Sequence, residues 1–208
     1  MKGKFITFEG CEGSGKSTQV ALFKEYLEKN KIDYLFTREP GGTKISEKIR
    51  SVILDIENSE MTDECEALLY ASARAQLIKE SIIPSLNAGK LVLCDRYIDS
   101  SIAYQGYARG LGEDFIRGIN SYAVNNCMPD YTIFLNISPK DAFSRKGGED
   151  KDDRLEQSGA EFHENVYKGY LAILEKESDR VISIDCSGSK WQTHEKILRE
   201  LRIRGIIR

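Results

Sequence analysis

The stretch Gly10–Ser17, GCEGSGKS, constrains the fold more than any other part of the sequence. It matches the pattern G-x-x-x-x-G-K-[ST], in which glycines let the backbone curl until successive N–H groups point at phosphate oxygens. In such a loop Lys16 reaches the β- and γ-phosphates, and the Ser17 hydroxyl ligates Mg²⁺. The alternative is a glycine-rich turn that binds nothing. A strand pattern before the loop, at 4–8, and a helix pattern after it, at 17–29, favour the phosphate loop.

The composition fits one folded domain. The chain has 208 residues, 40% apolar and 30% charged, so we expect a single domain, 1–208, in which 145–154 form a lid segment. The net charge of −3 provides no basic face, and we expect no nucleic-acid partner. No apolar run approaches the roughly 20 residues of a membrane span, and no signal peptide precedes the first strand. We therefore expect a cytoplasmic protein without a membrane partner.

The cysteines and histidines give no metal or disulfide pattern. Five cysteines without a C-x-x-C pair argue against a disulfide framework and against a zinc cluster. Cys11, inside the loop, and Cys94, in an apolar run, are interpreted as small buried filler. His163 and His194 lie far apart on expected helices and are interpreted as surface residues.

Strand and helix patterns alternate along the whole chain, which predicts an α/β fold with helices on both faces of a parallel sheet. Apolar, strand-like runs occur at 4–8, 34–37, 90–94, 131–136 and 180–185. Helical patterns occur at 17–29, 46–55, 63–87, 114–126, 159–177 and 191–201. We also expect Asp99-Ser100-Ser101 to cap a short helix that ends at Gly106.

Two loops at the carboxyl ends of strands carry polar residues, and ligands bind at that edge of a parallel sheet. The Pro and paired Gly of Arg38–Thr43 shape the first loop. The second is Asp95-Arg96-Tyr97. A carboxylate at Asp95, beside the phosphate loop, suits an outer-sphere Mg²⁺ ligand, and Arg96 suits a phosphate clamp.

Tyr70 and Arg74 share one helical face at i, i+4. An aromatic ring beside a guanidinium suits a planar ligand with polar edges. Periodicity alone favours the alternative, in which Tyr70 belongs to the core and Arg74 is solvated.

The segment Arg145–Arg154 is charged, contains glycine and lacks apolar residues. It is either a solvated loop or a lid whose cations close over phosphates. A small phosphotransferase needs such a lid together with cations for its acceptor, and Arg38, Arg50, Arg74 and Arg96 are candidates. A switch GTPase is disfavoured, because its N-K-x-D and D-x-x-G strings occur here only at 30–33 and 185–188, in the wrong order.

Several of these stretches together resemble bacterial thymidylate kinases, over a region from Phe5 to about Tyr170. The resemblance rests on Phe8–Gly10, Thr37–Thr43, Leu69–Arg74, Asp95–Tyr97, Ser100–Gly106 and Asp153–Leu155. It implies a three-layer α/β/α fold with a five-stranded parallel sheet, typical of nucleoside monophosphate kinases. It also implies transfer of a phosphoryl group from ATP to dTMP, with Mg²⁺ as cofactor, and a homodimer.

The resemblance assigns roles residue by residue. ATP would be bound by Gly10, Cys11, Glu12, Gly13, Ser14, Gly15, Lys16, Ser17 and Thr18, and the metal by Ser17, Asp95 and Glu12. The dTMP acceptor would be bound by Glu39, Pro40, Arg50, Tyr70, Arg74, Arg96, Ser100, Tyr104 and Gln105. Among these, Arg74 corresponds to the arginine that bonds the thymine ring, and Tyr70 occupies the position where the family commonly has a stacking Phe. Tyr104 corresponds to the residue that crowds a ribose 2′-OH.

The resemblance also separates two catalytic types. One type carries an arginine in the phosphate loop, at the position occupied here by Gly13, so in this chain the transition-state cation would come from the lid. Catalytic candidates are therefore Lys16, Glu12, Arg96, Arg145 and Arg154, with Lys146 and Lys151 in reserve. The alternatives are a kinase for another deoxynucleotide or for a nucleoside, and a nucleotide sensor without catalysis.

Overall fold

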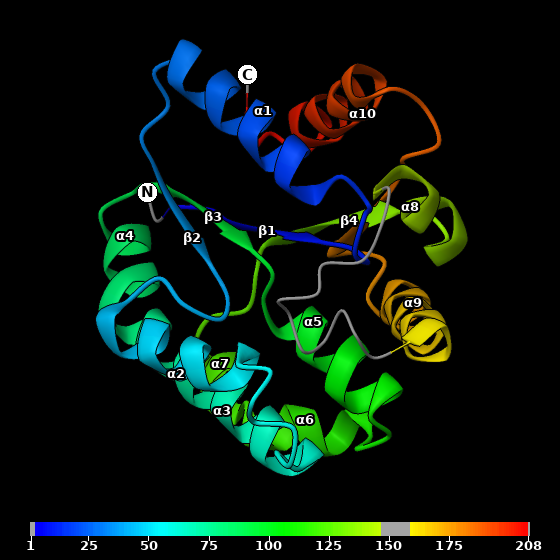
Figure 1. Ribbon diagram of the computed structural model, residues 1–208. Coiled ribbons are helices and arrows are strands. Elements are labelled where there is room, and N and C mark those ends of the chain that lie inside the picture. The colour runs from blue at the N-terminus through cyan, green and yellow to red at the C-terminus, as the bar shows by residue number, and fades with distance from the viewer. Residues whose placement is uncertain (1–2, 147–158, 208) are drawn as a thin grey trace.

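The computed structural model describes residues 3–146 and 159–207. Within these residues five strands form one parallel sheet in the order β2-β3-β1-β4-β5 (Figure 1). The strands are β1 (Phe5–Glu9), β2 (Tyr34–Arg38), β3 (Leu91–Asp95), β4 (Tyr131–Asn136) and β5 (Val181–Asp185). The expected α/β fold is confirmed, and strand β1, which is buried throughout, lies at the centre of the sheet.

Helices cover both faces of the sheet, because side chains of the central strands alternate between two apolar cores. On one face α1 (Lys16–Lys29) and α10 (Lys190–Ile203) pack together (Figure 1). Ile6 and Phe8 of β1 belong to that core, whereas Phe5 belongs to the core on the opposite face.

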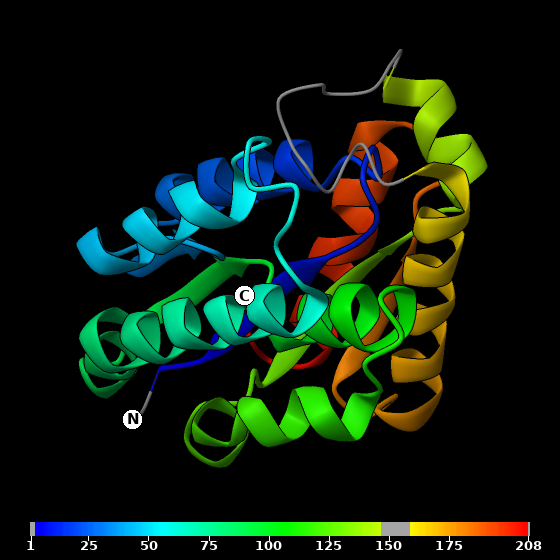
Figure 2. The same cartoon turned by 60° about the horizontal axis from the view of Figure 1, so that its bottom comes forward.

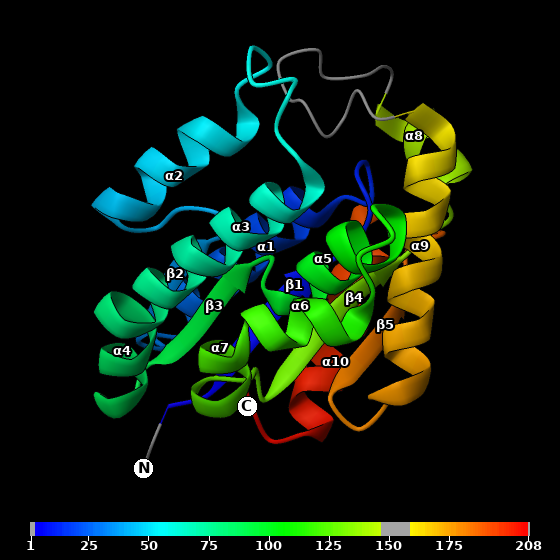
Figure 3. The same cartoon turned by 90° about the horizontal axis from the view of Figure 1, so that it is seen from below.

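The remaining helices lie mainly on that opposite face. Their bounds are α2 (Lys44–Leu54), α3 (Asp63–Leu77), α4 (Ile83–Asn87), α5 (Ile98–Ser101), α6 (Glu113–Ile119), α7 (Ser121–Asn126), α8 (Pro139–Lys146) and α9 (Gly159–Lys176). Two π-helical segments join them, η1 (Ile78–Ile82) between α3 and α4, and η2 (Ile102–Ala108) after α5. In two views α8 and α9 lie at the side of the molecule away from α4 (Figures 2 and 3).

The observed helices differ from the predicted ones in several places. The short helix expected to end at Gly106 continues as η2 to Ala108. The expected helix at 114–126 is interrupted at Asn120, and α8 was not expected at all. The expected helix at 63–87 consists of α3 and α4 joined by the wider turn of η1, which ends two residues before Pro84. A proline lacks the N–H that a regular α-helix needs, so a locally wider turn accommodates it.

The expectation that His163 and His194 lie at the surface was wrong, whereas the expectation that Cys11 and Cys94 are buried was confirmed. His163 is only 2% exposed and His194 8%. The ring of His163 packs edge-on against Phe143 of α8 and Phe162 of α9. Cys11 and Cys94 are buried, free thiols. No described helix is long and apolar enough to cross a membrane.

Helix α9 lies unusually close to η2, and Gly169 permits this contact. A Cβ atom at Gly169 would lie 2.9 Å from the Cα of Ala103 and 3.0 Å from the Cβ of Tyr107. Both neighbours belong to η2, which also carries Tyr104 and Gln105. The missing side chain at Gly169 therefore allows α9 to pack directly on the backbone of η2.

We expect Gly169→Ala to lower the free energy of unfolding by about 1–3 kcal/mol, because the added methyl group must displace backbone. Urea unfolding measures this change. Gly118→Ala in α6 is the matched control, since its Cβ would meet no atom within 4 Å. Gly118→Ala is expected to raise the free energy of unfolding by up to about 1 kcal/mol, because alanine has a higher helix propensity than glycine. Equal effects of the two substitutions would contradict the close packing.

Candidate functional site

The predicted phosphate loop connects β1 to α1, and its backbone follows the expected curl. Gly15 precedes α1 with a φ of 87° and Gly13 has a φ of 75°, both in the left-handed region that favours glycine. A Cβ at Gly13 would also lie only 2.6 Å from the carbonyl oxygen of Ala142 in α8. An arginine at position 13 therefore does not fit beside α8.

A cavity of about 590 Å³ opens on the phosphate loop, and we call it the donor cavity. Its lining includes every residue from Cys11 to Gln19. Its other lining residues are Arg145 of α8, Cys186 and Gly188 after β5, and Lys190 and Thr193 of α10. The Arg145 guanidinium donates a hydrogen bond of 3.1 Å to the Ser187 carbonyl oxygen, so this side chain is placed at the wall of the cavity.

A second cavity of about 290 Å³, the acceptor cavity, lies on the other side of the loop. All nine residues expected at the acceptor line it, namely Glu39, Pro40, Arg50, Tyr70, Arg74, Arg96, Ser100, Tyr104 and Gln105. Glu12 and Lys16 line both cavities. The two cavities therefore adjoin at one carboxylate and one ammonium group.

Lys16 is held at this junction by Asp95. Its ammonium group lies 2.5 Å from the Asp95 carboxylate at the end of β3. Burial and the nearby Arg96 guanidinium lower the pKa of Lys16, while Asp95 opposes that change. The register of the sheet helps to explain this pair. Asp95 lies opposite Phe8 near the end of β1, so β3 ends beside the point where the phosphate loop begins.

Arg96 adopts a left-handed backbone, with φ 67°, which costs energy in a residue other than glycine. Its guanidinium donates to the Gly10 carbonyl oxygen at 3.1 Å, to Ser100 Oγ at 3.2 Å and to the Tyr170 hydroxyl at 3.3 Å. It also forms an ion pair with Glu12. Arg96 therefore joins the phosphate loop, the acceptor cavity and α9.

Arg74 is buried, with 1% exposure, so the interpretation as a solvated residue was wrong. Its Nε donates to Glu39 at 2.7 Å, its Nη1 to Asn120 at 2.6 Å and its Nη2 to Ser101 at 3.0 Å. Burial raises the pKa of Glu39 to about 7, although Arg74 lowers it. Among the described residues, the other carboxylate oxygen of Glu39, Oε1, is buried without a hydrogen-bond partner.

The other acceptor candidates are also held by neighbours. Arg50 donates to the Pro40 carbonyl oxygen at 3.0 Å, and the Tyr104 hydroxyl donates to Glu12 at 3.1 Å. Gln105 donates from Nε2 to Glu66 at 2.8 Å. The lid candidates Lys151 and Arg154 lie outside the described residues.

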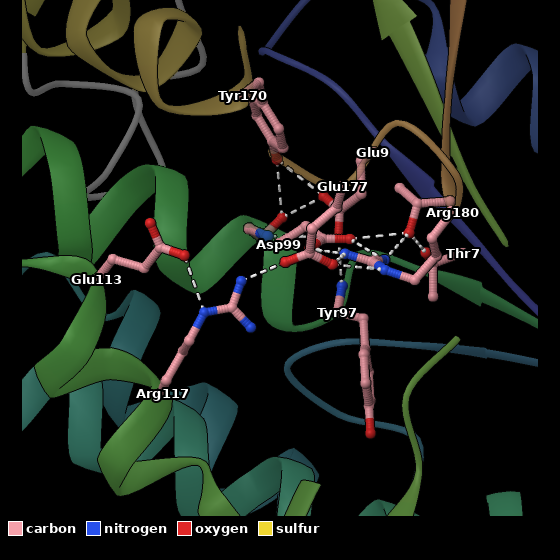
Figure 4. A network of polar contacts seen from close by, with 11 residues as sticks. Thr7, Glu9, Tyr97, Asp99, Glu113, Arg117, Tyr170, Glu177 and Arg180 are labelled. Carbon is pink, nitrogen blue, oxygen red and sulfur yellow. Dashed lines mark hydrogen bonds and ion pairs between the residues drawn. The ribbon is translucent and has the colours of Figure 1, made fainter. Parts of the chain in front are cut away.

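Glu9, a buried carboxylate at the end of β1, lies within a network of polar contacts that includes Tyr97 and Tyr170 (Figure 4). It accepts hydrogen bonds from the Tyr97 backbone N–H at 2.7 Å, from Ser100 Oγ at 2.6 Å and from the Tyr170 hydroxyl at 2.8 Å. Burial and the nearby Asp99 carboxylate raise the pKa of Glu9 to about 7. Ser100 and Tyr170 in turn hold Arg96.

The expected cap at Asp99-Ser100-Ser101 was wrong. Helix α5 begins after Tyr97 and has no side-chain cap. Asp99 instead accepts two hydrogen bonds from Arg180, both at 2.8 Å, and one from Thr132 at 2.8 Å (Figure 4). A buried carboxylate needs such partners, and a guanidinium supplies them more fully than backbone N–H groups at a helix start.

The sequence reasoning missed four buried polar residues that hold the site, namely Glu9, Glu66, Asn120 and Tyr170. A signal existed for Glu9, since an acidic residue inside an apolar strand is unusual. Asn120, Glu66 and Tyr170 carry no such signal, because their partners are distant in sequence.

Comparison with known proteins gives a consistent result. The sequence model of the family described as thymidylate kinase matches residues 8–197. A thymidylate kinase of Finegoldia magna is 47% identical over 203 residues, covering 98% of this chain and 100% of that protein. A thymidylate kinase of Geobacillus sp. (strain WCH70) is 49% identical over 189 residues, covering 90% of each. The crystal structure of thymidylate kinase from Ehrlichia chaffeensis superimposes with a TM-score of 0.77 at 31% identity, covering 97% of this chain and 99% of that one.

The raised pKa of Glu9 predicts a dependence of stability on pH. Its pKa in the folded protein, about 7, exceeds the ordinary value of 4.5. The stabilisation that Glu9 contributes is therefore complete when the pH is below its ordinary pKa, and it is lost as the pH rises through its pKa in the folded protein. The free energy of unfolding falls by about 3 kcal/mol over this range.

Glu9→Gln removes this titration while its amide can still bond the Ser100 and Tyr170 hydroxyl groups. We expect the fall in unfolding free energy between about pH 5 and about pH 8 to be smaller in the variant than in the wild type. Urea unfolding at the two pH values measures it, and part of the slope remains because Glu39 titrates in the same range. An unchanged slope would contradict the assignment.

Proposed function

Because the chain belongs to the thymidylate kinase family, we propose that it transfers the γ-phosphoryl group of ATP to dTMP, producing ADP and dTDP. One observation carries this function: a donor cavity on a phosphate loop and an acceptor cavity rich in arginine adjoin at Lys16 and Glu12. A phosphoryl group passing between two bound nucleotides crosses such a junction.

ATP binds with its phosphates on the loop Gly10–Thr18. The N–H groups of the loop and of the first turn of α1 point at phosphate oxygens, and the helix dipole favours their negative charge. Lys16 lies at the junction of the cavities and neutralises the group in transfer. Lys16 exchanges its partner Asp95 for phosphate oxygens when ATP binds.

The residues present fit a Mg²⁺ ion that accompanies ATP. Mg²⁺ is usually held by one or two carboxylates, water and substrate phosphates, and the carboxylates of Glu12 and Asp95 line the acceptor cavity together with Lys16. Ser17, Glu12 and Asp95 are the residues that would hold it, directly or through water. When bound, the ion neutralises charge on the β- and γ-phosphates.

dTMP binds in the acceptor cavity with its phosphate toward Arg96 and Arg50, and with its base toward Arg74. Arg74 keeps a fixed orientation because Glu39, Asn120 and Ser101 hold it before substrate arrives. Tyr70 provides an aromatic face for the base. Ser100 and Gln105 complete the polar edge, with Pro40 beside them and Tyr104 next to the sugar.

Catalysis consists mainly of positioning and of neutralising charge, since phosphoryl transfer has a loose transition state. Lys16 and Arg96 flank the transferred group, and Glu12 keeps Arg96 and Tyr104 in place. A further cation comes from the donor side. Arg145 is the candidate that lines the donor cavity, and Arg154 is the second candidate.

The chain acts as a single domain with a lid at 145–154, in the cytoplasm where its nucleotide substrates occur. It forms a homodimer and binds no nucleic acid. Light scattering in solution tests the dimer.

A coupled ADP-release assay across a panel of acceptors tests the function. We expect turnover with ATP that depends on dTMP and is far weaker with thymidine, because thymidine lacks the phosphate for Arg50 and Arg96. Lys16→Ala is expected to lose about 3–5 kcal/mol of transition-state stabilisation.

Other outcomes would favour other functions. Activity with thymidine but not with dTMP would indicate a nucleoside kinase, and ATP binding without acceptor-dependent turnover would indicate a sensor. Wild-type turnover in Lys16→Ala would contradict the role of Lys16.

A further inference from the structure

Glu66 is a fully buried carboxylate, 0% exposed, that lines neither cavity. It lies on α3, two helical turns before Arg74 and one before Tyr70, so the three side chains follow one side of the helix. Tyr70 and Arg74 line the acceptor cavity. Glu66 reaches that cavity through Gln105 of η2.

The contacts of Glu66 distinguish its two oxygens. Oε1 accepts a hydrogen bond of 2.8 Å from Gln105 Nε2, and Oε2 accepts one of 3.3 Å from Arg109 Nη2. Arg109 is itself placed by Asp63, 3.2 Å from its Nε, and by the ring of Phe162, 4.8 Å from its guanidinium carbon. Arg109 offers only donors, so Glu66 accepts a hydrogen bond from Arg109 as it does from Gln105.

We propose that Glu66 is a positioning residue that fixes the orientation of the Gln105 amide, so that the acceptor cavity meets its carbonyl oxygen and not its NH₂ group. The two ends of an amide have nearly the same shape, and only their hydrogen bonds distinguish them. A carboxylate accepts but does not donate, so it selects Nε2 as the end that faces it. Gln105 lines the cavity, and because its Nε2 bonds Glu66, we infer that Oε1 is the polar end that faces the cavity.

This orientation gives the acceptor cavity a preference among bases, and the inference rests on the proposed function of that cavity. Thymine and uracil carry a hydrogen on ring atom N3, which an amide oxygen accepts. Cytosine carries a lone pair at N3, which an amide oxygen repels. A site with a fixed acceptor discriminates strongly against a ligand that lacks the matching donor. Glu66 therefore acts on substrate choice without touching substrate.

Glu66→Gln tests this assignment. The substitution keeps the shape of the side chain, but the new side chain no longer requires the NH₂ end of Gln105 to face it. The new amide can accept from Gln105 or donate to it, so Gln105 can also present its NH₂ group to the cavity. We expect the ratio of kcat/KM for dTMP to that for dCMP to fall by about tenfold, chiefly through KM. The ratio for dTMP and dUMP stays constant, since both bases carry the N3 hydrogen.

Asp63→Asn is the matched control, because it weakens the other ion pair of Arg109 and leaves Gln105 untouched. We expect it to leave the dTMP to dCMP ratio unchanged. In the double variant Glu66→Gln/Gln105→Glu the two residue types are exchanged, so the side chain at position 105 again presents only an acceptor oxygen to the cavity. We expect this double variant to restore the preference for dTMP over dCMP. Thermal unfolding of each variant reports its stability separately from its specificity.

A lower stability of Glu66→Gln with an unchanged dTMP to dCMP ratio would overturn the proposal. Glu66 would then only anchor α3 to η2, and another acceptor such as Glu39 Oε1 would select the base. This outcome differs from failure of the proposed function, in which the wild-type protein itself lacks turnover that depends on dTMP.

Discussion

The active site depends on the hydrogen bonds and the ion pair that the Arg96 guanidinium makes. A mostly buried cation is tolerated only when its donors are paired, and here the partners come from the phosphate loop, from α5 and from α9. Arg96 makes all of these contacts from a left-handed backbone, with φ 67°. The energy cost of that conformation is offset by contacts on three elements, so the elements cannot shift independently.

The same principle extends outward from Arg96. Glu9 holds Ser100 and Tyr170, which hold Arg96, while Glu39 and Asn120 hold Arg74 in the neighbouring wall of the cavity. Arg96 and Arg74 therefore each have a buried acid or amide behind them. Such a site is organised before its ligands bind, which lowers the cost of positioning two nucleotides for transfer.

The sequence predicts the parts of this site that depend on local pattern. The loop Gly10–Ser17, the five strands and the two polar loops were all recognisable, because glycine spacing and apolar runs are local signals. Contacts between distant segments were not: the partners of Arg74 lie 27 to 46 residues away, and periodicity alone suggested a solvated residue. The structure also explains Gly13, since α8, which the sequence did not predict, fills the space an arginine would need.

The central claim is that donor and acceptor occupy adjoining cavities that meet at Lys16 and Glu12. A single ligand in which adenosine and thymidine are joined through a pentaphosphate chain tests it most directly, in steady-state inhibition against each substrate. We predict that this ligand competes with both ATP and dTMP and binds once per chain. Competition with only one substrate, or independent binding of two molecules per chain, would contradict it.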